Sequence, residues 1–168
     1  VAADPNPRRC KGARGIKRRG MEVQYVSATP ELKAKLKEQS ESNASDFIRF
    51  DDNYLSLIAL VDDRPVALIV AKSRPLPAPL EMVQEAFIDI IEVQPEYRRQ
   101  GIGTALVERV VGWAKDDELW QVRAWSEEVR YEALMLWRKF GFAFSRVDFQ
   151  RDGEMRYGFY VARALSPG

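Results

Sequence analysis

Two glycines, Gly101 and Gly103, separate an apolar run from a stretch with helical periodicity. The apolar run spans residues 86–93, and apolar side chains recur at helical spacing from Ala105 to Ala114. Glycine has no Cβ, so a ligand can approach the backbone closely, and the unpaired N–H groups of a helix's first turn attract an anion. The pattern predicts a strand that ends at a helix with an anion-binding N-terminus.

The residues beside these glycines make phosphate the expected anion. Two arginines precede them, and no carboxylate follows before Glu108, which suits a negative ligand at the helix start. We therefore expect a pyrophosphate to be held mainly by backbone N–H groups. The expected binding residues are Arg98, Arg99, Gln100, Gly101, Ile102, Gly103 and Thr104. An ordinary tight turn between a strand and a helix is the alternative.

Two other phosphate-binding motifs do not fit. A dinucleotide-binding fingerprint needs a third glycine where this chain has Leu106. A phosphate loop of the GxxxxGK[ST] type needs a lysine and a hydroxyl residue that follow neither glycine.

The run from Val93 to Gly103, V-x-P-x-x-R-x-x-G-x-G, resembles the acetyl-CoA signature of the GNAT N-acetyltransferase superfamily. The segment 133–142 is similar to that family's later helix, which closes in a basic turn and the pair Gly141-Phe142. Together these elements cover residues 84–144, whereas residues 21–83 agree only in pattern. The resemblance implies an acetyl-CoA co-substrate, no metal, and an amine acceptor on a small molecule or a peptide.

The expected fold is α/β (α+β): a GNAT-like mixed, twisted, mostly antiparallel sheet of about seven strands with helices on both faces. Periodicity, caps and turn residues place the elements. Strands are expected at 22–27, 55–61, 65–72, 86–93 and 119–124, and Asp62-Asp63-Arg64 is expected to join the second and third of them in a hairpin. A closing hairpin is expected to pair Val147 and Phe149 with Tyr157, Phe159 and Val161 across Asp152-Gly153. Helices are expected from Thr29-Pro30, at 45–50, from the glycines to about 115, and at 128–140.

The charge distribution divides the chain in two. Residues 1–20 hold seven Lys or Arg and one Asp, a balance of +6, so the total of +1 leaves −5 for the rest. We expect 1–20 to be a basic disordered tail or sequence upstream of a start at Met21, and 21–165 to be a single GNAT acetyltransferase domain. A nucleic-acid or membrane-binding arm is the alternative for the tail.

The chain has no histidine, and its one cysteine, Cys10, lies in the tail. A Ser-His pair, a cysteine nucleophile and a Cys/His zinc site are therefore excluded in the domain. These absences favour direct attack by the substrate amine in a ternary complex. No apolar run approaches a membrane span. We expect a cytoplasmic protein without nucleic-acid or membrane partners, and a homodimer is compatible with the sequence.

The amine must lose a proton before it attacks the thioester, and two carboxylates are candidates for the base. Asp89 is expected on the same strand face as Phe87, Ile91 and Val93, either as an unpaired base or paired with Arg123. Glu92, expected on the opposite face, is either the base, a water-positioning group or a solvated side chain.

Tyr131 is the candidate acid for the leaving thiolate, with simple packing as the alternative. The resemblance implies that Ile91 and Val93 offer backbone to the pantetheine arm. Some family members that acetylate protein N-termini carry a glutamate base where this chain has Gln121 and a tyrosine acid where it has Trp137. An amide and an indole cannot replace that pair.

Arg130 stands where the family often has an asparagine and is expected to contact the cofactor. Because of these departures, an acyl-CoA-binding or sensing module with weak catalysis is the alternative function.

Residues 125–128 look like an insertion before the later helix. They form either part of an amine pocket or a loop in which Ser126 caps that helix. A cationic acceptor is weakly favoured, because acidic residues are expected near the mouth of the site. These are Glu81, Glu85, Glu92, Glu127, Glu128 and Asp148.

Overall fold

The computed structural model describes residues 20–165, and the tail predicted at 1–20 lies almost wholly outside them. Seven strands form one sheet in the order β1-β2-β3-β4-β5-β9-β6. They are β1 (Gln24–Ser27), β2 (Tyr54–Val61), β3 (Arg64–Pro75), β4 (Gln84–Val93), β5 (Gln121–Glu127), β9 (Gly158–Ala164) and β6 (Ala143–Arg146). Only β4 and β5 pair in parallel, so the predicted mixed, mostly antiparallel sheet is confirmed.

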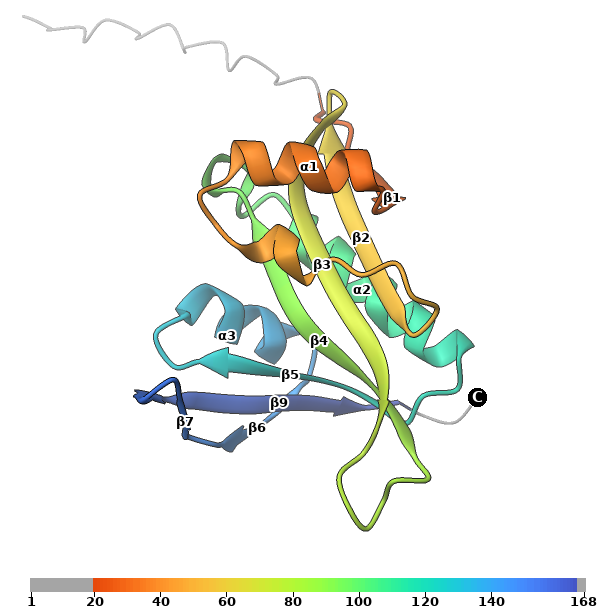
Figure 1. Cartoon of the computed structure of the whole chain (residues 1–168), viewed down its shortest axis with the longest axis vertical. Coiled ribbons are helices and arrows are strands. Elements are labelled where there is room, and N and C mark those ends of the chain that lie inside the picture. The colour runs from red at the N-terminus through yellow and green to blue at the C-terminus, as the bar shows by residue number, and fades with distance from the viewer. Residues whose placement is uncertain (1–19, 166–168) are drawn as a thin grey trace, which may run out of the picture.

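Helices cover both faces of this sheet, as predicted (Figure 1). The helix α1 (Pro30–Gln39) and the 3-10 turn η1 (Ala44–Phe47) lie on one face, over a cluster that includes Ile48 and Leu68. The helix α2 (Ile102–Asp116) packs on the other face, and Trp137 of α3 (Tyr131–Lys139) joins the same core. A short 3-10 turn, η2 (Pro95–Tyr97), connects β4 to the start of α2.

The start of α1 follows the predicted cap. Thr29 has extended backbone, its Oγ1 accepts a hydrogen bond from Leu32 N at 3.2 Å, and Pro30 occupies the first helical turn. The pKa of Glu31 is lowered by a hydrogen bond from its own backbone N–H and by the Thr29 hydroxyl. This carboxylate therefore stabilises the helix start in its ionised form.

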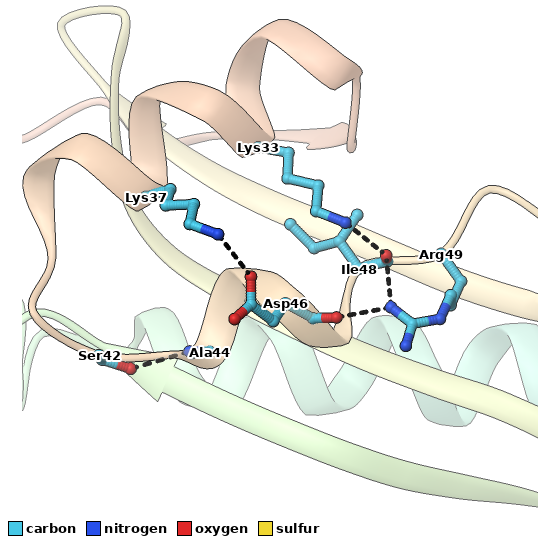
Figure 2. A network of polar contacts seen from close by, with 7 residues as sticks. All are labelled: Lys33, Lys37, Ser42, Ala44, Asp46, Ile48 and Arg49. Carbon is cyan, nitrogen blue, oxygen red and sulfur yellow. Dashed lines mark hydrogen bonds and ion pairs between the residues drawn. The ribbon is translucent and has the colours of Figure 1, made fainter.

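Polar contacts fix η1 against α1 (Figure 2). Lys37 Nζ lies 3.2 Å from Asp46 Oδ1, and Lys33 Nζ donates to the Ile48 carbonyl at 3.1 Å. The Arg49 guanidinium donates to that same carbonyl at 3.0 Å. Phe47 and Arg49 line a cavity together with residues of β2, β3 and β4.

The hairpin between β2 and β3 is confirmed. Asp62 and Asp63 both have positive φ, 49° and 61°, which matches the twist of a tight two-residue turn. The strands run antiparallel from Tyr54↔Lys72 to Val61↔Arg64.

The strand β4 contains a β-bulge that the alternation of residues does not reveal. Val70 pairs with Ile90 and the next residue, Ala71, pairs with Ile88, so Asp89 has no partner on β3. Because one extra residue is inserted, Ile91 and Val93 pack towards α2, while Ile90 packs under α1 and η1. The prediction that Asp89 shares a face with Ile91 and Val93 is therefore wrong.

The strands β4 and β5 are paired for only a short distance. Their register contains Ala86↔Val122, Phe87↔Arg123 and Ile88↔Ala124, and beyond these pairs the two strands diverge (Figure 1). The second half of β4 thus has β3 on one edge and no strand on the other.

The expected loop at residues 125–128 is instead the end of β5 and the turn that follows it. Every residue of β5 pairs with β9, from Gln121↔Ala164 to Glu127↔Gly158. The prediction that Ser126 caps a helix from 128 is wrong, because Ser126 is a buried strand residue and α3 begins at Tyr131. Pairing across the sheet overrides the local capping signal here.

The closing hairpin is split in two. The Asp152-Gly153 turn has positive φ at both residues, as predicted, but it joins only the short strands β7 (Phe149–Arg151) and β8 (Glu154–Arg156). Phe159 and Val161 instead belong to β9, which lies between β5 and β6. Among residues 20–165, no helix is both long and apolar enough to cross a membrane.

Candidate active site

The N-terminus of α2 has the geometry that the glycines predict. Gly101 has φ +83° and Arg99 has φ +59°, and the first helical hydrogen bond runs from Ala105 N to the Gly101 carbonyl at 3.0 Å. The N–H groups of residues 102–104 therefore have no acceptor within the helix. No atom lies within 4 Å of the place where a Cβ on Gly101 would stand, so this turn is open to a ligand.

Two side chains brace the turn before the helix. Arg98 Nε donates to the Val93 carbonyl at 2.9 Å, and Gln100 Nε2 donates to the Glu96 carbonyl at 3.0 Å. Arg98 and Arg99 are exposed, so their charges face the solvent beside the helix start. This arrangement favours an anionic group at the end of β4.

The free edge of β4 lies next to this helix start. The N–H of Gln94 points to β3, where it donates to the Val66 carbonyl at 2.9 Å, so the backbone groups of Ile91 and Val93 point the opposite way. Their side chains contact α2: a Cβ on Gly103 would lie 3.8 Å from Val93 Cγ2 and 4.0 Å from Ile91 Cδ1. Backbone groups of β4 that have no strand partner, of which the Val93 carbonyl is bound by Arg98, and unpaired helix N–H groups thus flank one opening.

Asp89 forms an ion pair that the sequence did not reveal. Lys72 Nζ lies 3.0 Å from Asp89 Oδ1, with side chains that are 28% and 14% exposed. The pair lines a cavity of about 180 Å³ together with Phe47, Arg49 and Tyr54. The expected alternative, a pair with Arg123, is wrong because Arg123 binds Glu85 instead. Asp89 is thus a mostly buried carboxylate that lines this cavity.

Glu92 accepts a hydrogen bond of 2.6 Å from the Ser42 hydroxyl, in the loop before η1. It therefore faces the α1 and η1 side of the sheet, as Asp89 does. The expectation that the two acids lie on opposite faces is wrong, because the bulge at Asp89 changes the alternation of the strand.

Tyr131 and Arg130 lie apart from this cavity. Tyr131 is 73% exposed and contributes to an apolar hollow of about 600 Å³ with Met135 and Phe144, which contains neither Asp89 nor Glu92. Arg130 precedes α3 without capping it, and its Nε lies 3.7 Å from Glu127 Oε2.

Gln121 and Trp137 each have a structural setting. Gln121 Nε2 donates to Glu85 Oε2 at 2.8 Å. Trp137 is 2% exposed, packs against Phe142, and has an indole N–H without a partner among the described residues.

Glu85 is the polar residue whose environment sequence reasoning missed most clearly. It is fully buried, and its Oε1 accepts hydrogen bonds from Arg74 Nε at 2.9 Å and Arg123 Nη2 at 2.7 Å. The expectation that Glu85 lines an open mouth is therefore wrong. The charged residues Arg74, Glu85 and Arg123 are visible in the sequence, but only the register of β3, β4 and β5 shows that they lie together.

Other acids expected at the mouth are neutralised by arginines. Glu127 pairs with Arg156 at 3.1 Å, while Arg146 lies 2.8 Å from Asp148 and 2.7 Å from Glu128. Their carboxylates, Asp148 first, raise the pKa of Arg146. These pairs remove much of the basis for the expected attraction of a cationic acceptor. Among residues 20–165, no group of three or more Cys, Asp or Glu side chains is placed to hold a metal ion.

The acetyltransferase (GNAT) family matches residues 22–142, which is well over half of the chain. The chain therefore belongs to the GNAT acetyltransferase family. A 63-residue stretch is 30% identical to streptothricin acetyltransferase A of Bacillus subtilis (strain 168), and it covers 38% of this chain and 36% of that protein. The match thus spans about a third of the length of this curated relative.

Solved structures show the same fold. Arabidopsis thaliana NAA60 in complex with a bisubstrate analogue superposes with a TM-score of 0.72 at 14% identity, over 88% of this chain and 100% of that one. The ribosomal-protein-S18-alanine N-acetyltransferase of Escherichia coli gives a TM-score of 0.64 at 18% identity, over 86% and 95%. At these identities the likeness establishes the fold alone.

Proposed function

We propose that this chain is an acetyl-CoA-dependent N-acetyltransferase that moves an acetyl group to a primary amine of a small molecule or peptide. The observation that carries the proposal is the open N-terminus of α2 beside the free edge of β4, within a family of acetyltransferases. A diphosphate and an amide-bearing arm require these two kinds of backbone donor and acceptor.

In this proposal the pyrophosphate of acetyl-CoA binds the N–H groups of residues 99–104, with Arg98 and Arg99 as the flanking charges. Ile91 and Val93 offer backbone hydrogen bonds to the pantetheine arm on the edge that β5 has left. The observed geometry supports this fit, because the turn at Gly101 is unfilled and the helix N–H groups lack acceptors.

The reaction is a direct acyl transfer. The amine nitrogen loses a proton to a base, forms a bond to the thioester carbon, and the C–S bond then breaks to release CoA. Asp89 and Glu92 are the candidate bases. Asp89 is the better placed, since it lies in a cavity at the bulge where β4 and β5 diverge.

The leaving thiolate has little need of an acid. A thiol has a pKa near 8.5, so the thiolate is a competent leaving group and can take its proton from water. Tyr131, the expected acid, is mostly exposed and lines a different hollow. We therefore assign it no necessary role, and Arg130 at most a peripheral contact with the cofactor.

A thiol-release assay tests the proposal. The names of the similar proteins mention streptothricin and a ribosomal-protein alanine, so the panel contains small-molecule amines and peptide N-termini. Release of CoA thiol and a mass gain of one acetyl group on an acceptor support the transfer. An acetylated enzyme, formed without acceptor and able to transfer its acetyl group, would contradict direct attack.

The second candidate is a module that binds acyl-CoA without turnover. It is favoured by Gln121 and Trp137, whose side chains cannot serve as base and acid and are engaged in other packing. Tight CoA binding by calorimetry, combined with no thiol release across the panel, would support it over transfer.

A further inference from the structure

Three cationic side chains surround the ring of Phe87 on the α1 side of the sheet. Lys72 Nζ lies 5.8 Å, Arg74 Cζ 3.7 Å and Arg123 Cζ 5.7 Å from the ring centroid. Lys72, Arg74 and Arg123 are here named the cationic cluster. Their side chains are 28%, 31% and 16% exposed, so the cluster is reached from solvent.

A buried carboxylate holds the two arginines in fixed positions. Glu85 is fully buried, and its Oε1 accepts hydrogen bonds from both Arg74 and Arg123. The Arg123 guanidinium also lies 4.8 Å from the ring of Tyr160. Because carboxylate and rings restrict both guanidinium groups, little side-chain entropy is lost when a further partner binds.

The cluster retains charge and donors for such a partner. Three cations face two carboxylates, Glu85 and Asp89, so one positive charge is left over. Glu85 uses only Nε of Arg74, whose side chain is 31% exposed. Glu85 likewise uses only Nη2 of Arg123, whose side chain is 16% exposed. A guanidinium with unused donors matches the planar oxygens of an oxyanion.

The cluster is continuous with the cavity that contains the candidate base. Lys72 contacts Asp89 at 3.0 Å and lies over the same Phe87 ring as Arg74. We propose that the amine acceptor also carries an oxyanion, a carboxylate or a phosphate, that binds Arg74 and Arg123 while its amine reaches Asp89. The inference rests on the proposed function and defines the acceptor class.

Pairs of C-terminally amidated dipeptides test it. Gly-Glu is compared with Gly-Gln, and Gly-phosphoserine with Gly-Ser, so each pair offers the same amine with and without an oxyanion. Affinity is measured by NMR titration of the CoA-saturated protein, and transfer by thiol release. We expect at least one anionic dipeptide to bind about tenfold more tightly than its neutral partner. The pair in which the anionic dipeptide binds more tightly shows whether the site prefers a carboxylate or a phosphate.

The variant Arg74→Gln should bring that ratio close to one, and Arg74→Lys should retain part of it. Arg64→Gln, which removes an exposed arginine at the start of β3, should leave the ratio unchanged. Thermal melts and CoA titration verify that each variant folds. Equal affinities within both pairs, no measurable binding of any dipeptide, or a ratio that survives Arg74→Gln would overturn the inference. In that case, release of CoA thiol with neutral acceptors would still support the proposed transferase activity. Preferential binding of the anionic dipeptides without any thiol release would instead support the oxyanion site and contradict only the transfer reaction.

Discussion

Lys72 and Asp89 form an ion pair of 3.0 Å at the one residue of β4 that has no partner on β3. The Asp89 carboxylate lines the cavity under η1, and the lysine holds it there. A carboxylate in this position is oriented for contact with a substrate and is still reached by solvent.

The first prediction concerns the base. The value of kcat/KM should rise with pH as the base loses its proton, and this rise is the acidic limb of the pH profile. The variant Asp89→Asn should lack the acidic limb and should lower the rate by about 10²-fold or more. Asp52→Asn, at an exposed position, should keep the wild-type profile. If the limb is lost in Glu92→Gln instead, Glu92 is the base. A limb retained in both variants would leave water as the proton acceptor.

The second prediction concerns Arg98. The variant Arg98→Ala loses a charge at the helix start and the brace to the Val93 carbonyl. CoA binding should weaken by about 1.5–3 kcal/mol, the range of a charge-assisted hydrogen bond. Lys115→Ala, at the far end of α2, is the matched control and should bind CoA normally in the same calorimetric titration.

The third prediction compares the two glycines. Gly101→Val places a β-branched side chain at φ +83° and in the space proposed for the pyrophosphate, so CoA affinity should fall further than in Arg98→Ala. A Cβ on Gly103 would meet only ordinary contacts of 3.7 Å or more, so Gly103→Ala should fold and melt close to wild type. Unchanged CoA affinity in the valine variant would show that the phosphate site lies elsewhere.

The fourth prediction concerns the buried carboxylate. Glu85→Gln leaves Arg74 and Arg123 without their counter-charge and should lower the free energy of unfolding by about 3 kcal/mol. Glu81→Gln, four residues earlier and exposed, should have an effect near zero. Urea denaturation of both variants measures the change in the free energy of unfolding. Equal urea midpoints for the two variants would contradict a structural role for the ion pairs of Glu85.

The fifth prediction uses the cap of α1. Thr29→Ala removes the hydrogen bond to Leu32 N and should cost about 1 kcal/mol. The pKa of Glu31, lowered first by its own backbone N–H and then by Thr29, should rise in the variant. The pKa of Glu31 is lower in the folded state than in the unfolded state. The stabilisation that ionised Glu31 gives the folded state is therefore present above the unfolded pKa and is lost as pH falls through the folded pKa. NMR titration of the Glu31 carboxyl carbon measures the shift.

Local signals were sufficient for the elements around α2. The apolar periodicity and the glycines located the helix that begins at Ile102, and its end at Asp116 agrees with the predicted end at about residue 115. The turn residues at Asp62-Asp63 and Asp152-Gly153 were also correctly identified. In each case the cause lies within a few neighbouring residues, so the sequence contains it directly.

The errors arose where distant strands decide the outcome. Nothing near Asp89 marks a bulge, because the shift appears only in the pairing of β4 with β3. Ser126 has the chemistry of a helix cap but lies opposite Phe159 on β9. Arg123 could reach either Asp89 or Glu85, and the register of β4 with β5 selects Glu85.

The bulge also limits how this chain can change over time. Removing residue 89 would restore strict alternation without turning over the rest of β4, because Ile88 and Ile90 already pair with the consecutive residues Ala71 and Val70. Ile91 and Val93 would still face α2, so this deletion would cost the candidate base and its ion pair with Lys72 but not the face of the strand. A one-residue deletion between Ile90 and Val93 would instead turn over the residues that follow it, and the opening between strand and helix would lose its apolar lining.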